Sequence, residues 1–128
     1  AYVRWTLRAE EEKMGIVYVF TNDSMPGIVK IGKTDKSVEE RLRSLDGTSV
    51  PTPFRFYFAI DSDRFNEIES YMHNTFSEQR VRDNREFFRI NPERAVSALR
   101  IAGASEVKLA NEMIDEDGNI VQEEKAKK

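Results

Sequence analysis

Two short runs of strand-forming residues, joined by a turn-forming segment, constrain the fold of this chain more than any other feature. Residues 16–21 and 28–33 are rich in Val, Ile, Tyr and Phe, and the connecting NDSMPG contains residues that favour turns. The pattern predicts an antiparallel hairpin. Because side chains alternate along a strand, Tyr18 and Lys30 each share a face with apolar neighbours. We therefore expect the sheet to be covered on both sides.

The rest of the chain predicts helices and further extended segments. Ser37, with Glu40 three positions later, forms a capping box before an apolar helical pattern. The predicted elements are a helix over about 38–46, a strand over 54–60, the longest helix over about 64–78, a short extended piece at 86–90, and a helix that begins at Asn91 and Pro92 and ends near Gly103.

Length and composition predict one soluble globular domain without cysteine chemistry. The chain has 128 residues, of which 39% are hydrophobic and 34% charged. It has no apolar run near the roughly 18 residues of a membrane span and no secretory signal pattern. We therefore expect an intracellular, cytoplasmic protein that binds no membrane. The absence of cysteine excludes disulfides, thiolate metal sites and zinc fingers.

Charge is distributed unevenly along the chain. Residues 104–128 carry seven acids and four lysines, which accounts for the whole net charge of −3, and 1–13 carry three charges of each sign, so 14–103 is neutral. We interpret 1–13 as an N-terminal extension or linker, 14–103 as the domain, and 104–128 as an acidic tail, with a small hairpin as the alternative. Five arginines in the domain are either a phosphate-tracking surface or a solvated face: Arg80, Arg82, Arg85, Arg89 and Arg94.

A carboxylate on the longest predicted helix is a candidate metal ligand. Helical geometry places Glu69 within about 40° of Phe65, at the edge of the buried stripe, where a carboxylate needs a partner. That partner is either a metal ion or an arginine in a salt bridge. His73, four residues later, lies on the same side. It could support the metal site, donate to a phosphate, or serve only packing.

Three basic residues and a tyrosine complete the set that phosphodiester hydrolysis needs. Arg41 lies within about 60° of Val38, so its guanidinium can border the core and hold a phosphate, or snorkel to solvent. Tyr18 is either a packed strand residue or a base. The second role requires nearby cations, because the pKa of free tyrosine is about 10, and Lys30 and Lys33 on the next strand could supply them.

The order of these fragments resembles the GIY-YIG nuclease superfamily, in its phage-type branch related to the bacteriophage T-five open-reading-frame domain and the meiotically up-regulated nuclease domain. The matching stretches are VYVFTNDSMPGIVKIGKT, RLRSL, IESYMHNTF and REFFRI. The resemblance implies an α+β fold with a small three-stranded antiparallel sheet flanked by helices. It also implies DNA cleavage that depends on a divalent cation, Mg²⁺ or Mn²⁺.

The resemblance assigns roles by position. Tyr18 matches the proposed water activator, Arg41 the arginine that steadies the phosphate, and Glu69 the single metal-binding glutamate. Asn84 is the counterpart of a late asparagine, with Glu86 as the alternative. The chain departs from the pattern with Ile16 in place of glycine and Lys30 in place of the second tyrosine.

The leading interpretation is a one-metal endonuclease acting on DNA, with low sequence specificity. Its candidate catalytic residues are Tyr18, Lys30, Arg41, Glu69, His73 and Asn84, and its candidate DNA contacts are Lys33, Arg80, Arg82, Arg85 and Arg89. Lys30 either lowers the pKa of Tyr18 or marks a site that binds DNA without cutting it. The alternatives are a DNA-binding or regulatory module that has lost turnover, and an interaction protein that uses its acidic tail.

Overall fold

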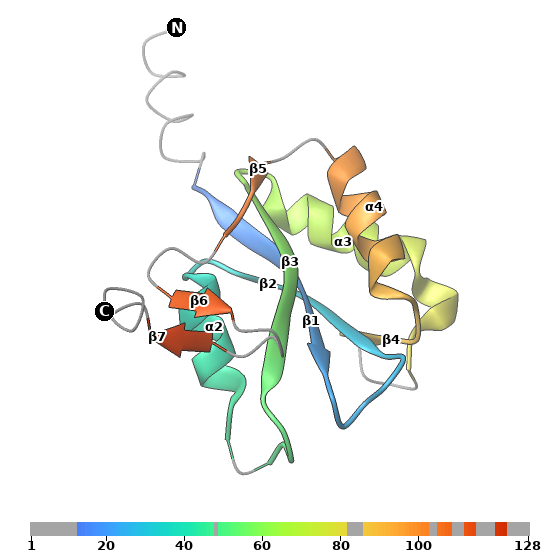
Figure 1. Ribbon diagram of the computed structural model, residues 1–128. Coiled ribbons are helices and arrows are strands. Elements are labelled where there is room, and N and C mark those ends of the chain that lie inside the picture. The colour runs from blue at the N-terminus through green and yellow to red at the C-terminus, as the bar shows by residue number, and fades with distance from the viewer. Residues whose placement is uncertain are drawn as a thin grey trace, which may run out of the picture.

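An antiparallel sheet with helices on both faces forms the fold, as a computed structural model shows (Figure 1). The structure describes residues 13–47, 49–81, 86–102 and 105–108, and the backbone of 112–114 and 120–122. The sheet contains β1 (Gly15–Asn22), β2 (Val29–Thr34), β3 (Phe54–Ser62), β4 (Phe87–Phe88) and β5 (Ser105–Glu106). The helices are α2 (Val38–Leu45), α3 (Phe65–Thr75) and α4 (Pro92–Ile101), with a 3₁₀ turn η1 (Ser77–Gln79) after α3. The predicted α+β class is confirmed.

The sheet has five strands in the order β4-β2-β1-β3-β5, so the expectation of three strands is wrong. The two additional strands contain only two residues each. Strand β4 pairs with Val29 and Lys30 of β2, and β5 pairs with Ile60 and Asp61 of β3. Segments this short show no two-residue periodicity in the sequence. They are extended because they pair with the edges of the long strands.

The predicted hairpin is present as β1 and β2. Their antiparallel register sets Tyr18 opposite Gly32 and Phe20 opposite Lys30. Gly27 in the connection has φ of 82°, a left-handed conformation that glycine adopts without steric cost. Because directly opposed residues share a face, the register places Tyr18, Gly32 and Lys30 on the same side of the sheet.

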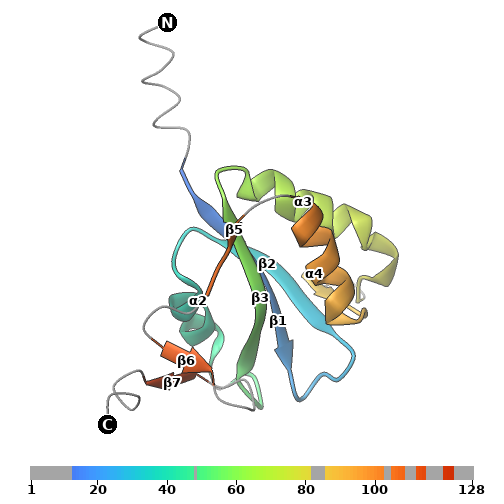
Figure 2. The same ribbon diagram turned by 45° about the horizontal axis from the view of Figure 1, so that its top comes forward.

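The sheet is buried on both faces, as predicted. Figures 1 and 2 both show α3 and α4 on one side and α2 on the other. We call these sides the α3 face and the α2 face. The α3 face contributes the larger core, which includes Val17, Val19, Ile31, Met72, Phe88 and Leu99. The α2 face contributes the smaller core, which includes Tyr18, Phe20, Val38, Leu42, Phe54 and Ala59.

The predicted helix caps are confirmed. The amide of Glu40 donates to Ser37 Oγ at 3.0 Å, and the amide of Ser37 donates to Glu40 Oε1 at 3.2 Å. Asn91 caps α4, whose first residue is a proline. Helix α3 ends at Thr75 rather than near residue 78, because the chain tightens there into η1.

The sheet extends past the boundary predicted at residue 103. The amide of Val107 donates to the carbonyl of Ala59 at 2.9 Å, and Val107 packs against the smaller core. Farther on, β6 (Glu112–Ile114) and β7 (Ile120–Gln122) pair in antiparallel fashion, the arrangement of a small hairpin. Among the described residues, no helix is long and apolar enough to cross a membrane.

Candidate active site

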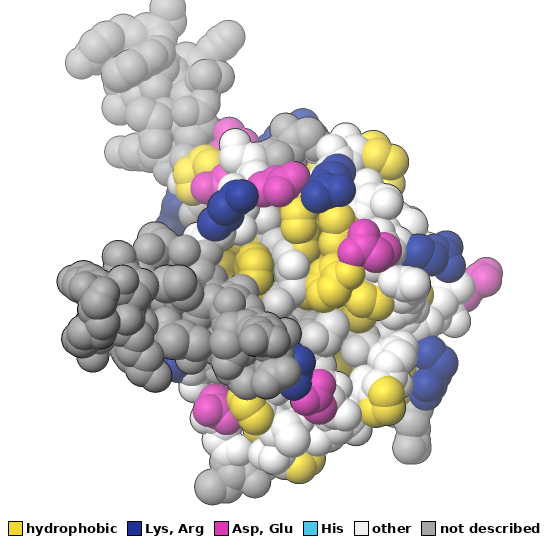
Figure 3. Space-filling view, viewed as in Figure 1, with side chains coloured by type: hydrophobic (Ala, Val, Ile, Leu, Met, Phe, Trp, Pro, Cys, Tyr) yellow, Lys and Arg dark blue, Asp and Glu magenta, His cyan; other side chains and the backbone are white. Residues whose placement is uncertain are grey.

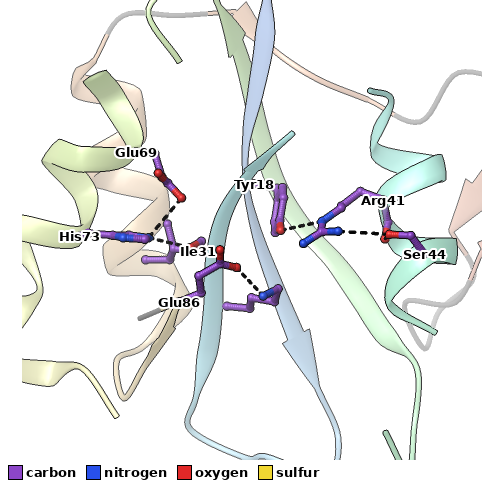
Figure 4. A network of polar contacts seen from close by, with 8 residues as sticks. Tyr18, Ile31, Arg41, Ser44, Glu69, His73 and Glu86 are labelled. Atoms are coloured by element: carbon purple, nitrogen blue, oxygen red, sulfur yellow. Dashed lines mark hydrogen bonds and ion pairs between the residues drawn. The ribbon is translucent and has the colours of Figure 1, made fainter. Parts of the chain in front are cut away.

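Tyr18 and Arg41 form a polar pair inside the α2 face. Tyr18 lies in the middle of β1, has no exposed surface, and stacks on Phe20 with ring centroids 4.0 Å apart. Arg41, on the inner side of α2, donates a hydrogen bond from Nε to Tyr18 Oη at 3.1 Å (Figure 4). Its Nη1 donates to Ser44 Oγ at 3.3 Å, so the helix itself orients the guanidinium. Helical geometry places Arg41 toward the core, as the sequence indicated.

The phenol of Tyr18 is held in its neutral form. Burial raises the pKa of Tyr18 above its ordinary value of 10.0, the hydrogen bond and charge of Arg41 lower it, and the charges of Glu86 and Glu69 raise it further. The net effect is to raise the pKa of Tyr18. Arg41 is the cation beside the phenol. Because its pKa is raised, Tyr18 carries its proton at neutral pH.

Lys30 lies on the same face as Tyr18 but pairs with a carboxylate. It is 7% exposed, and its ammonium lies 2.5 Å from Glu86 Oε1. The same ammonium lies 5.0 Å from the centre of the Phe87 ring. A nearly buried charge of this kind needs a partner, and Glu86 is held near it because its carbonyl accepts the amide of Ile31 at 2.9 Å. Glu86, the alternative to Asn84 in the sequence, therefore lies beside Lys30, whereas Asn84 lies outside the described residues.

Gly32 creates the space in which these groups meet. A Cβ built on Gly32 would lie 2.4 Å from Tyr18 Oη and 3.0 Å from Glu86 Oε1. The missing side chain therefore allows the phenol and the carboxylate to approach one another over the strand. A glycine inside a strand is a known sign of such an approach, and this signal is present in the KIGK sequence of β2.

Glu69, His73 and Lys33 form a second group on the α3 face. Glu69 Oε1 lies 3.6 Å from Lys33 Nζ, and Glu69 Oε2 lies 3.6 Å from His73 Nε2. His73 Nε2 donates to the carbonyl of Ile31 at 2.8 Å, because a carbonyl can only accept (Figure 4). Lys33 also donates to Asn66 Oδ1 at 2.6 Å. Each predicted lysine is thus paired with a carboxylate.

The two groups lie on opposite faces and approach each other at one margin of β2. Strand β4 pairs with β2 at Val29 and Lys30, whereas no described strand pairs with the outer side of Gly32, Lys33 or Thr34. At this margin His73, from α3, donates a hydrogen bond to the carbonyl of Ile31. Gly32 has no side chain, so the hydroxyl of Tyr18 lies close to its backbone. The charge of Glu69 acts on the phenol of Tyr18. The candidate residues therefore form two groups on opposite faces of β2 and are not gathered in one pocket.

Glu69 is the single metal ligand that the sequence predicts. No group of three or more His, Cys, Asp or Glu side chains able to hold a metal occurs in the described part of the chain. Lys33 Nζ and His73 Nε2 each lie 3.6 Å from an oxygen of Glu69, outside hydrogen-bond range. Its oxygens therefore keep lone pairs for a further ligand. A single carboxylate suits Mg²⁺, which retains most of its waters, so Glu69 fits a one-ligand site.

The structure describes only some of the residues that the sequence predicts to contact DNA. Arg80 lies over the Phe88 ring at 5.4 Å, and its buried Nε has no hydrogen-bond partner. Arg80 and Arg89 line the same shallow pocket beside η1. Arg82, Asn84 and Arg85 lie outside the described residues. On the face seen in Figure 3, the described basic side chains are dispersed among acidic ones around an apolar centre, so this face offers no continuous basic surface.

Comparison with known proteins gives one match. A family model described as the T5orf172 domain matches residues 15–103, the part of the chain that contains both groups of candidate residues. The comparison with curated proteins and the comparison with solved structures found no match.

Proposed function

Because the chain belongs to the T5orf172 domain family, we propose that it is an endonuclease that hydrolyses DNA phosphodiester bonds at a GIY-YIG-type site with one divalent metal ion. The contact between Arg41 and Tyr18 supports this proposal most strongly. It joins, inside the folded chain, the two residues to which the superfamily resemblance gives the roles of steadying the phosphate and activating the water. A buried phenol needs a hydrogen-bond partner in any fold, so the contact supports the proposal through the identity of the two residues and not by its presence alone.

Each described residue has a defined task in this proposal. Arg41 uses two of its donors on Tyr18 and Ser44, and the remaining N–H groups can bind phosphate oxygens. Tyr18 keeps its proton and orients the attacking water. Glu69 would hold Mg²⁺ or Mn²⁺, which supplies Lewis-acid stabilisation of charge on the phosphate. His73 fixes the strand margin beside Glu69 through Ile31.

DNA would be bound mainly through its phosphates. Arg80 and Arg89 lie at one pocket, and contacts of this type position the nucleic acid without reading its sequence. The described elements include no helix or ribbon dedicated to base recognition. The proposal therefore includes low sequence specificity.

Plasmid nicking tests the proposed function. Wild-type protein is incubated with supercoiled plasmid and Mg²⁺ or Mn²⁺, beside Glu69→Gln and the matched control Glu67→Gln. Glu67 lies on the same helix, pairs with Arg64 and is exposed. We expect Glu69→Gln to lose about 10²-fold or more in rate and Glu67→Gln to match wild type. Equal nicking by wild type and Glu69→Gln would reject the site.

One observation favours a second candidate function, a DNA-binding module without turnover. Lys33 already stands beside Glu69, and Lys30 beside Glu86, so the carboxylates are neutralised without a metal. Such a module would bind DNA in a salt-dependent manner and leave the plasmid intact. Binding measured at several salt concentrations, together with the nicking assay, separates the two functions.

A further inference from the structure

Two side-chain oxygens on successive turns of α3 face one cationic nitrogen. Asn66 Oδ1 accepts a hydrogen bond from Lys33 Nζ at 2.6 Å, and Glu69 Oε1 lies 3.6 Å from the same nitrogen. Residues three positions apart on a helix lie on the same side, so the amide and the carboxylate border one space. Lys33 enters that space from β2. The ammonium of the chain itself therefore marks a place where two oxygens surround a positive charge.

The two oxygens of Glu69 have different surroundings. Oε2 faces His73, whose Nε2 lies 3.6 Å away and donates to the carbonyl of Ile31 (Figure 4). A ring nitrogen that carries a hydrogen has no lone pair for a metal ion. On the other side, Oε1 is accompanied by the amide oxygen of Asn66, because both approach Lys33. Oε1 is thus the carboxylate oxygen with a further oxygen donor group beside it.

This donor set suits a hard divalent cation. Carboxylate and amide oxygens are ligands that Mg²⁺ and Mn²⁺ accept, and Mg²⁺ takes few protein ligands because it keeps several waters. Glu69 is 9% exposed, whereas Asn66 is exposed to solvent. A hydrated cation can therefore approach from the side of the amide, reach the buried carboxylate, and retain its remaining waters toward solvent.

We propose that Asn66 is a second oxygen ligand of the divalent cation at Glu69, and that the Lys33 ammonium holds the same place until that cation binds. This inference rests on the proposed function, because it takes Glu69 as the metal ligand. It adds a neutral ligand three positions before the carboxylate, and it gives Lys33 the role of a competing cation.

Lys33 is able to leave the site. Its side chain is 42% exposed, and its four-carbon stem is flexible. An ammonium and a divalent cation repel each other strongly at the separation that one shared carboxylate oxygen would impose. Lys33 must therefore move away when the metal binds. Asn66 carries no charge, so it can exchange its hydrogen bond with Lys33 for a bond to the metal.

The competing explanation is that Asn66 only anchors Lys33. In that case the loss of Asn66 changes metal binding solely through the lysine, and it has no effect once the lysine is removed. A ligand, in contrast, contributes to metal affinity whether Lys33 is present or absent. The Lys33→Met background separates the two explanations, because methionine has no donor for Asn66 and no charge.

The test is a Mn²⁺ titration without DNA, followed by electron paramagnetic resonance. It compares wild type, Lys33→Met, and Lys33→Met combined with Asn66→Ala or with Asn66→Asp. Glu69→Gln shows whether the ion binds at this carboxylate. Thermal melting verifies that each variant is folded, which we expect because Asn66 is exposed.

Lys33→Met combined with Asn74→Asp is the matched control. Asn74 is an exposed asparagine on the same helix, but helical geometry places it about 140° from Glu69. An aspartate there changes the net charge as much as one at position 66, without adding an oxygen to the site. Any difference between the two aspartate variants therefore reports direct contact with the metal.

In the Lys33→Met background, we expect Asn66→Ala to weaken Mn²⁺ binding about tenfold, because an oxygen ligand is lost. Asn66→Asp should tighten it about two- to fivefold, because the ligand gains a charge. Asn74→Asp should leave it unchanged. Equal affinity with and without Asn66→Ala, or equal gains from the two aspartates, would overturn the inference.

Plasmid nicking measured in parallel keeps this inference separate from the proposed function. Nicking that requires Glu69, together with Mn²⁺ binding that is indifferent to Asn66, would overturn the second ligand and leave the endonuclease standing. A chain that binds Mn²⁺ through both residues and leaves the plasmid intact would support the site and overturn the endonuclease. Wild type that binds no Mn²⁺ would overturn the site.

Discussion

The Nε of Arg41 lies 3.1 Å from the hydroxyl oxygen of Tyr18, although 23 positions separate the two residues along the chain. The pair connects the helix on the α2 face with the central strand of the sheet. It also sets the phenol in its orientation, because Tyr18 is fully buried and Arg41 is its side-chain hydrogen-bond partner. Several measurable consequences follow from this contact and from the groups around it.

Replacing Arg41 by methionine should reduce nicking strongly. Methionine keeps much of the side-chain length but removes every donor, so both the phenol and the phosphate lose a charged partner. We expect a fall of about 10²- to 10³-fold in single-turnover rate. Arg43→Met on the same helix is the control, because Arg43 points to solvent. Equal losses in the two variants would indicate a general effect of charge on DNA binding.

Replacing Gly32 by alanine should damage both stability and activity. The new Cβ would stand 2.4 Å from Tyr18 Oη, and the buried ring has no room to move away. We expect a loss of about 1–3 kcal/mol in the free energy of unfolding, measured by urea denaturation. Gly47→Ala is the control, because nothing lies within 4 Å of its Cβ position, and it should be about 0.4–1 kcal/mol more stable than wild type. Equal stability of the two variants would contradict the close approach.

Alkaline pH should destabilise the wild-type chain more than Tyr18→Phe. Burial raises the native pKa of Tyr18 above 10.0, so the native state keeps this proton at pH values where the unfolded chain loses it. The resulting stabilisation is fully present below pH 10.0 and is lost as pH rises through the native pKa. Urea unfolding at about pH 9 and pH 11 measures the difference.

Tyr57→Phe is the control for that experiment. The pKa of Tyr57 is also raised, chiefly by its hydrogen bond to Glu93, but its side chain is exposed to solvent. Solvent screens such a contact, so we expect a smaller change in alkaline stability than for Tyr18→Phe. A larger effect at Tyr57 would contradict the assignment of the buried phenol as the dominant alkaline group.

Replacing Lys33 by glutamine should tighten metal binding at Glu69. The ammonium lies 3.6 Å from Glu69 Oε1 and competes with any divalent cation for that oxygen. We expect Mn²⁺ to bind about two- to fivefold more tightly, the equivalent of a solvent-exposed ion pair of about 0.5–1 kcal/mol. Titration without DNA, followed by electron paramagnetic resonance, measures this directly. Glu69→Gln should abolish the binding, and tight binding by that variant would place the metal elsewhere.

The sequence predicted the elements whose signals are local. The capping box at Ser37 and Glu40, the alternation of β1 and the apolar stripe of α3 each depend on a few neighbouring residues, and all three are present. The inward position of Arg41 follows from helical geometry in the same way. The extended piece predicted over 86–90 contains β4, but its pairing with β2 was not predicted, and β5 was not predicted at all, because both depend on pairing with a distant edge.

The partners of the two lysines could not be predicted for a related reason. The sequence leaves open whether Lys30 lowers the pKa of Tyr18 or marks a site that binds DNA without cutting it. In the structure Lys30 contacts Glu86, which lies 56 positions away along the chain. Such a choice depends on which carboxylate the fold brings nearby, and two-residue β4 sets the position of Glu86. The strand glycine at residue 32 was the one local sign that side chains converge there.

The outer margin of β2 beyond Ile31 has no neighbouring strand among those described, and the candidate groups lie along it. A long polymer laid against such a margin continues past it in both directions, whereas a tunnel admits only a free end. A nuclease of the proposed kind, with its site at such a margin, would require no terminus to begin its work. Covalently closed circles and the interior of a chromosome would be as accessible to it as a broken fragment.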